Sequence, residues 1–159
     1  MVTRSRGEQS APLVLIARIA TMLPTSNVPT SVAAQFPPQV VATLIELFGN
    51  DLQQWRFIVD LFCETAEQDL ANLENAIHGG EDTQIVEAAH RIVGSARMLG
   101  HQPIGDAARR IERAAQSIGP YLQRAEEMQS ALTDLCAVVD EFRQQASDCP
   151  WPNAAGAVR

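Results

Sequence analysis

The residues of this chain that could perform chemistry lie close together around His90, between Glu87 and Arg97. A neutral imidazole carries a lone pair at near-neutral pH, so a histidine can act as a nucleophile or as a metal ligand. Glu87 is spaced to orient the ring by accepting a hydrogen bond from its N–H group, although a solvated helix charge is the simpler explanation of this residue. Arg91 and Arg97 add positive charge to the same segment. His90 is therefore the candidate chemical residue of this chain.

Helical spacing places His90 on the outer face of its helix. The apolar residues around it recur at intervals of three and four, as in an amphipathic helix. With about 100° per residue, His90 lies roughly 140° from the centre of that apolar stripe, which argues against a packed core histidine. The stripe consists of Ile85, Ala89, Ile92, Ala96 and Leu99.

The face that carries His90 also carries a glycine and two valines. Gly94 lies one turn after His90 and costs about 1 kcal/mol of helix propensity relative to Ala, with no cap or kink to explain it. The absent side chain would clear an approach to His90 for another macromolecule. We expect Val86, Val93 and Gly94 to form a docking patch for that partner.

The rest of the chain is patterned to hold this helix in a bundle. Apolar stripes and turn residues predict a short helix over 37–48 and a long one from a cap at Asn50 or Asp51 to Ile77. Further helices are expected over 81–99, over 103–118 with Ile118 on the apolar stripe, and over 121–148. No strand-like alternation is present. We expect an all-α fold, an antiparallel up-down-up-down four-helix bundle with a short additional N-terminal helix.

The two ends of the chain are expected to lie outside this bundle. Residues 1–35 predict a flexible linker or tail, 36–148 the bundle, and 149–159 a disordered tail. The apolar run 13–23 is too short to cross a bilayer, which takes about 20 residues. Arg18 and Pro24 also argue against a signal peptide. No membrane insertion is expected, and the three cysteines, which share no metal-type spacing, indicate reduced thiols in the cytoplasm.

The charge pattern combines an acidic chain with one basic segment. The net charge is −7, which argues against a nucleic-acid partner. All 12 basic residues are arginines. Arg109, Arg110 and Arg113 extend the basic segment that begins at Arg91 and could face an acidic partner, although a solvated helix face explains them equally well.

A family resemblance becomes specific at residues 89–100. Their sequence, A-H-R-I-V-G-S-A-R-M-L-G, resembles the signature A-H-x-L-K-G-S-[SA]-x-x-x-G of histidine-containing phosphotransfer (HPt) domains. Ile111 and Glu112 stand where the family's next helix ends in L-E. Residues 57–77 resemble its preceding helix, and residues 79–82 its turn. The resemblance covers Pro37 to Ala146.

The resemblance implies a carrier of phosphoryl groups in two-component signalling. His90 would accept the phosphoryl group on Nε2 from the aspartate of one receiver domain and pass it to the aspartate of another. The receiver would supply Mg²⁺, and the chain would need no cofactor or metal of its own. It would be a phosphotransfer carrier without ATP-dependent kinase activity. Stand-alone forms and C-terminal domains of membrane-bound hybrid sensor kinases are both compatible with the pattern.

One departure from the family concerns the charge beside the histidine. The family usually has Lys three residues after it, and this chain has Val93. Arg97, two turns after His90, is the expected substitute, because a guanidinium group suits phosphate geometry. Arg91 could only assist. The residues expected to support the chemistry are Gly94, Arg97, Arg91, Ser95 and Glu87.

Two other functions fit parts of the same pattern. Glu87 and His90 have the spacing of a di-iron ligand pair, but such sites need a second copy and two further inward Glu residues, which are missing. Alternatively, the bundle could bind receivers without accepting phosphate, because the usual Lys is absent. His78 and His101, at helix ends, are expected to be structural or incidental.

Overall fold

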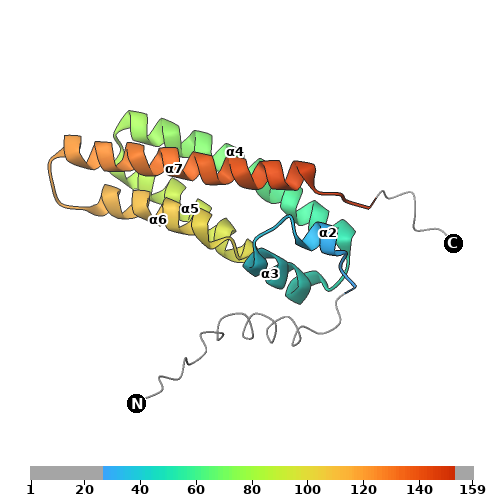
Figure 1. Cartoon of the computed structure of the whole chain (residues 1–159). Helices are drawn as coiled ribbons and strands as arrows, with labels where there is room; N and C mark the ends of the chain where they lie inside the picture. The colour runs from blue at the N-terminus through green and yellow to red at the C-terminus, as the bar shows by residue number, and fades with distance from the viewer. Residues whose placement is uncertain (1–26, 153–159) are drawn as a thin grey trace, which may run out of the picture.

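The computed structural model describes residues 27–152, and every regular element within them is a helix (Figure 1). This confirms the expected all-α class. The helices are α2 (Thr30–Ala33), α3 (Pro38–Phe48), α4 (Leu52–Gly79), α5 (Asp82–Leu99), α6 (Gln102–Gln116) and α7 (Tyr121–Asp148).

The four long helices lie side by side around a common core (Figure 1). α4 packs against α5 and α7, and α6 packs against the same two helices. α2 and α3 lie at one end of this bundle, where α3 contacts α4 and α5. Each long helix buries an apolar stripe, which is the main source of stability for helices in water. The largest fully buried side chains include Trp55, Phe142, Leu44, Leu73, Ile92, Ile111 and Leu135.

Gly100, at the end of α5, the helix of His90, packs closely against α3. It ends α5 in the left-handed conformation, with φ of +79°. A Cβ at this position would collide with the Thr43 side chain of α3 and lie 3.0 Å from the Gln39 carbonyl oxygen. Only glycine satisfies both the backbone conformation and the close approach of α3. The turn therefore fixes both the end of α5 and the position of α3 against it.

His101 caps the helix that follows. Its Nδ1 accepts a hydrogen bond of 3.3 Å from the Ile104 N–H group at the start of α6. The ring is buried and lies edge-on to Phe142, with 4.9 Å between the ring centroids. Burial lowers the pKa of His101 below its ordinary value of 6.5. The neutral ring is therefore part of the fold, in agreement with the structural role expected for this residue.

The stability of the bundle is expected to depend on the protonation of His101. In the unfolded chain the ring takes up a proton near pH 6.5, whereas the folded chain resists it. The contribution of the neutral ring is therefore complete above that pH. It is lost as the pH falls below it, by up to about 1.4 kcal/mol per pH unit. Urea unfolding of the wild type and of His101→Asn, which keeps a capping side chain, should give a stability difference that shrinks from pH 7.5 to pH 5.5. An equal difference at both values would contradict the prediction.

Several boundaries differ from the sequence expectation. Residues 27–35 were expected to belong to a tail, but they include α2, and Val32 is buried. Trp151, in the expected C-terminal tail, donates an indole hydrogen bond to the Ala146 carbonyl and packs against Phe36. α6 ends at Gln116, so Ile118 is fully exposed rather than part of a stripe. Aromatic packing of Phe36 against Trp151 joins these two segments, and sequence periodicity does not report such long-range contacts.

No helix within residues 27–152 is long and apolar enough to cross a membrane. The apolar run 13–23 lies outside the described residues.

Candidate functional site

His90 lies on the exposed face of α5, as predicted. Its side chain is 74% exposed, whereas all five residues of the predicted apolar stripe are buried. The neighbours of α5 on either side, α4 and α6, leave only part of the helix open to solvent. His90 lies at the edge of that open part, next to α6. Its one hydrogen-bond partner in the described residues comes from α6.

That partner is Glu112. Nδ1 of His90 lies 3.2 Å from Oε1 of Glu112, whose side chain is only 21% exposed. The predicted carboxylate partner, Glu87, makes no hydrogen bond to His90 within the described residues, so the prediction for Glu87 is not supported. Glu112 was noted in the sequence as part of the family's L-E ending but was given no role. Its contact with His90 depends on the register between two helices, which the sequence of either helix does not specify.

If His90 carries phosphoryl groups, as the family resemblance implies, removing the Glu112 carboxylate is expected to slow the transfer. The carboxylate holds the proton on Nδ1 and so keeps the Nε2 lone pair free. A hydrogen bond to a charged group contributes about 1.5 kcal/mol, which corresponds to roughly tenfold in rate. We expect Glu112→Ala to reduce the transfer rate from a phosphorylated receiver by about this factor. Glu87→Ala is the matched control and should leave the rate unchanged. The reverse order of the two variants would restore Glu87 as the orienting residue.

Arg91 is held away from His90 by a second carboxylate. Its Nε donates to Oδ1 of Asp69 on α4 at 3.1 Å. Asp69 is 8% exposed and lies among the buried positions of α4. A charge on a buried stripe requires a partner, and Arg91 provides it. Asp69 was not expected at the site from the sequence, although its position one turn after Ala66 was a usable signal. Arg91 therefore ties α5 to α4 and is not available as a free cation.

The other expected supporting residues have different environments. Gly94 faces open space, because a Cβ built on it meets no atom within 4 Å. Ser95 is half-buried, and its hydroxyl group donates to the Ile92 carbonyl of its own helix at 3.1 Å. Arg97 is exposed on the same side of α5 as His90. Gly94 and Arg97 thus share the exposed face with His90, whereas Ser95 does not.

The expected docking patch needs a correction. Val93 is 6% exposed, and Val86 is half-buried against the core. Val93 lines a cleft together with residues of α6, and Val86 lies on the same flank of α5. On a helical wheel Val93 is only about 80° from the centre of the apolar stripe, so a neighbouring helix can cover it. Of the three residues expected to contact a partner, only Gly94 lies on the open face.

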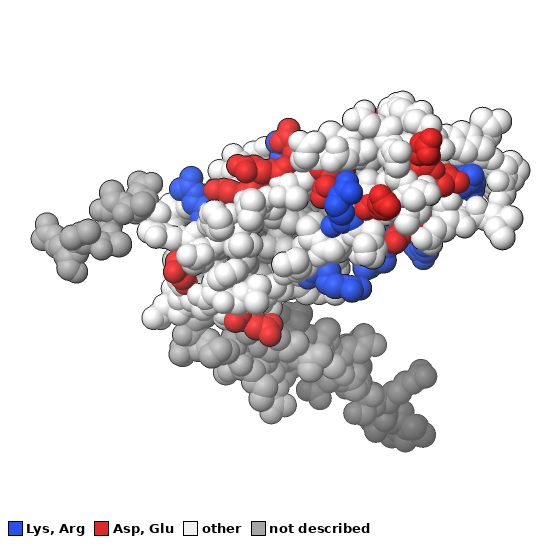
Figure 2. All heavy atoms as spheres, turned by 180° about the vertical axis from the view of Figure 1, so that it is seen from behind, with Lys and Arg blue, Asp and Glu red and all other residues white. Residues whose placement is uncertain are grey.

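On the face shown in Figure 2, acidic and basic side chains are interspersed rather than separated into two regions. Most arginines of the described residues pair with carboxylates, for example Arg110 with Asp134 and Arg143 with Glu67. Arg97 and Arg113 are the exceptions within residues 27–152, since neither forms an ion pair there. Arg97 is therefore the uncommitted cation on the helix of His90.

The cysteines do not compete with His90 as nucleophiles. Burial raises the pKa of Cys63 and of Cys149 to about 11, and it also raises the pKa of Cys136. Few thiolates are therefore present at neutral pH, and the thiolate is the reactive form. Within residues 27–152 no three His, Cys, Asp or Glu side chains lie close enough together to hold a metal ion. Within these residues, Glu87 and His90 of the di-iron alternative therefore do not belong to a group of three or more such side chains.

Comparison with known families gives one match. The family described as Hpt domain matches residues 58–148, which is more than half of the chain and includes all of α5, α6 and α7. Comparisons with curated proteins and with solved structures gave no match. Hpt domains take part in the phosphorelays of two-component signalling and interact with receiver domains. With a match of this extent on an all-helical fold, the chain belongs to the Hpt domain family.

Proposed function

We propose that this Hpt domain accepts a phosphoryl group on Nε2 of His90 from the aspartate of one receiver domain and passes it to the aspartate of another. The observation that carries the proposal is the environment of His90. Its Nδ1 is engaged by Glu112 at 3.2 Å, while the side chain remains 74% exposed. One ring nitrogen is thus fixed by the protein, and the other is left for a macromolecular donor.

The proposed transfer needs no reactant besides His90 and the receiver's aspartyl phosphate. With the proton on Nδ1, the Nε2 lone pair attacks the phosphorus of the receiver's aspartyl phosphate. The N–P bond forms as the P–O bond breaks, and the aspartate leaves with the bonding electrons. The phosphorylated ring then carries positive charge, which the Glu112 carboxylate stabilises. The reverse step returns the phosphoryl group to a second aspartate. The receiver would supply Mg²⁺, and this chain would need no cofactor of its own.

Arg97 is the proposed cation on the helix of His90. It is exposed, lies two turns after His90, and has no ion pair within the described residues. Long helical side chains point back toward the N-terminus of their helix, which directs Arg97 toward His90. Arg91 is less suited to this role, because Asp69 holds its guanidinium group.

The receiver is proposed to dock over Gly94 and the apolar surface next to it. An apolar groove between α3, α4 and α5 is lined by Leu47, Leu61 and Met98, among others. Met98 is 78% exposed and lies one turn after Gly94 on the same helix. Apolar side chains beside Gly94, which has no side chain of its own, would allow the receiver to approach His90 closely. This surface replaces the docking patch that Val86 and Val93 were expected to form.

We also infer the topology and the setting that this function requires. Short connections between consecutive long helices support an antiparallel up-down-up-down bundle with α3 as its additional N-terminal helix. Because this domain would exchange phosphoryl groups with receiver domains, we propose that it lies with them in the cytoplasm. It would be either a free protein or part of a sensor kinase.

A direct transfer assay tests the proposal. A panel of receiver domains is charged with radiolabelled acetyl phosphate and incubated with the full chain. Acid-labile label on the chain, at His90, is the expected result. The alternative, a docking module that does not accept phosphate, predicts receiver binding without label. That outcome would overturn the proposal.

A further inference from the structure

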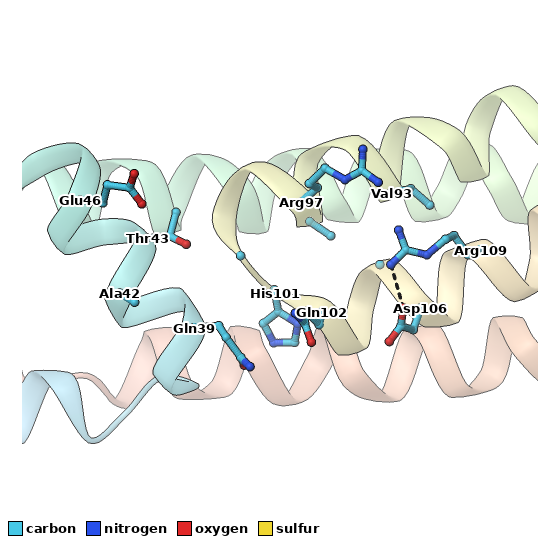
Figure 3. Close-up of a pocket in the computed structure, with 13 residues that line it drawn as sticks. Gln39, Ala42, Thr43, Glu46, Val93, Arg97, His101, Gln102, Asp106 and Arg109 are labelled. Atoms are coloured by element: carbon cyan, nitrogen blue, oxygen red, sulfur yellow. Dashed lines mark hydrogen bonds and ion pairs between the residues drawn. The ribbon is translucent and has the colours of Figure 1, made fainter. Parts of the chain in front are cut away.

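A cleft of about 600 Å³ lies between α3, α5 and α6, and Val93, one turn after His90, lines it. In Figure 3, Arg97 extends from α5 and Arg109 from α6 toward the same region beside Val93. Val93 itself is almost completely covered. Two guanidinium groups from different helices therefore border an apolar position that lies one helical turn after His90.

The register between α5 and α6 explains the position of Arg109. His90 contacts Glu112, and a Cβ on Gly105 would lie 3.7 Å from the Cβ of Ala96. The two helices thus run in opposite directions, so the residue three after His90 faces the residue three before Glu112. Arg109 is consequently opposite Val93. Its guanidinium group reaches one turn back along α6, with Nη2 3.6 Å from the Cβ position of Gly105, and has to turn toward Glu112 to meet a group on His90.

Arg109 is paired in the structure, but with an exchangeable partner. Its Nη2 donates to Oδ1 of Asp106, one turn earlier on α6, at 2.7 Å. The Asp106 side chain is 67% exposed, and exposed ion pairs of this kind contribute little to stability. A phosphoryl group carries about 1.5 to 2 negative charges and offers three acceptor oxygens. It can therefore compete with a single exposed carboxylate for the guanidinium group.

We propose that Arg109 and Arg97 together form the site that holds the phosphoryl oxygens on His90, with Asp106 as the resting counter-ion of Arg109. This inference rests on the proposed phosphorylation of His90 and adds a cation from a second helix. It also gives a physical reason why Val93 is tolerated where the resemblance leads one to expect Lys. The positive charge comes from the residue opposite Val93 instead.

The test uses the full chain, phosphorylated with phosphoramidate, which requires no receiver. The phosphohistidine signal is followed by phosphorus NMR as a function of pH. A nearby cation favours the dianionic phosphoryl group and lowers the titration midpoint. We expect the midpoint in Arg109→Ala to lie higher than in the wild type by roughly half a pH unit, and Arg97→Ala to behave similarly. Asp106→Asn should lower the midpoint, because Arg109 is released.

Arg110→Ala is the matched control. Arg110 is exposed, lies about 100° round α6 from Arg109, and pairs with Asp134 of α7. Its removal should leave the midpoint unchanged. The double variant Arg109→Ala/Val93→Lys should restore the wild-type midpoint, because the Lys stem can lie along apolar surface while its ammonium group stays in water. Circular dichroism verifies that each variant is folded.

The outcomes separate this inference from the proposed function. If the wild type gains no phosphohistidine signal that His90→Gln lacks, the proposed function is wrong. If the signal forms but titrates identically in the wild type and in Arg109→Ala, only the assignment of Arg109 is overturned. An equal shift in Arg110→Ala would also overturn it, since that result indicates a general effect of surface charge.

Discussion

Replacing His90 with glutamine is expected to abolish phosphoryl acceptance completely while leaving the bundle folded. Glutamine keeps a polar side chain but offers no ring nitrogen with a free lone pair, so the N–P bond cannot form. The His90 side chain is 74% exposed, and surface substitutions of this kind change stability by about 0.5 kcal/mol or less. Incubation with a radiolabelled, phosphorylated receiver should therefore give no acid-labile label above background, with an unchanged unfolding transition.

His78→Gln provides the matched control for this result. His78 is the other exposed histidine of the described residues and lies at the end of α4, where Nδ1 contacts the Glu74 carbonyl. Its replacement should leave labelling at the wild-type level. Label that persists in His90→Gln, or that disappears in His78→Gln, would move the site of phosphorylation away from His90.

Gly94→Gln is expected to slow transfer from a receiver on the order of a hundredfold without unfolding the chain. Overpacking a close contact costs up to about 3 kcal/mol, which corresponds to this factor. In the isolated domain a Cβ at Gly94 meets no atom within 4 Å, so the substitution has room. Gly94→Ala should raise the free energy of unfolding by about 1 kcal/mol, because alanine favours helix. Greater stability together with slower transfer would identify Gly94 as a residue retained for docking.

Two measurements make this result specific to docking. Labelling by phosphoramidate, which is small enough to reach His90 past a glutamine, should be unaffected in Gly94→Gln. Gly79→Gln is the control substitution, because Gly79 also faces open space but ends α4 at a different part of the bundle. Normal transfer by Gly94→Gln would show that receivers do not approach over this position.

Much of the fold followed from local sequence patterns. The repeat of apolar residues at three and four positions located the helices, because it reports which side of a helix must be buried. The same repeat correctly placed His90 on the outside of α5. It failed at Ile118, because α6 ends at Gln116, before the pair Gly119 and Pro120. It also failed to predict that Phe36 and Trp151 pack against each other, because that contact is tertiary.

The sequence by itself therefore determined the all-α class, the candidate nucleophile and the family resemblance. Only the tertiary structure decided which side chains surround His90. The pairing of His90 with Glu112, the pairing of Arg91 with Asp69 and the burial of Val93 all depend on which flank of α5 each neighbouring helix covers. Helical periodicity defines the buried side of one helix, but it does not specify the register between two. That register brings Glu112 to the nucleophile and Arg109 to the position opposite Val93.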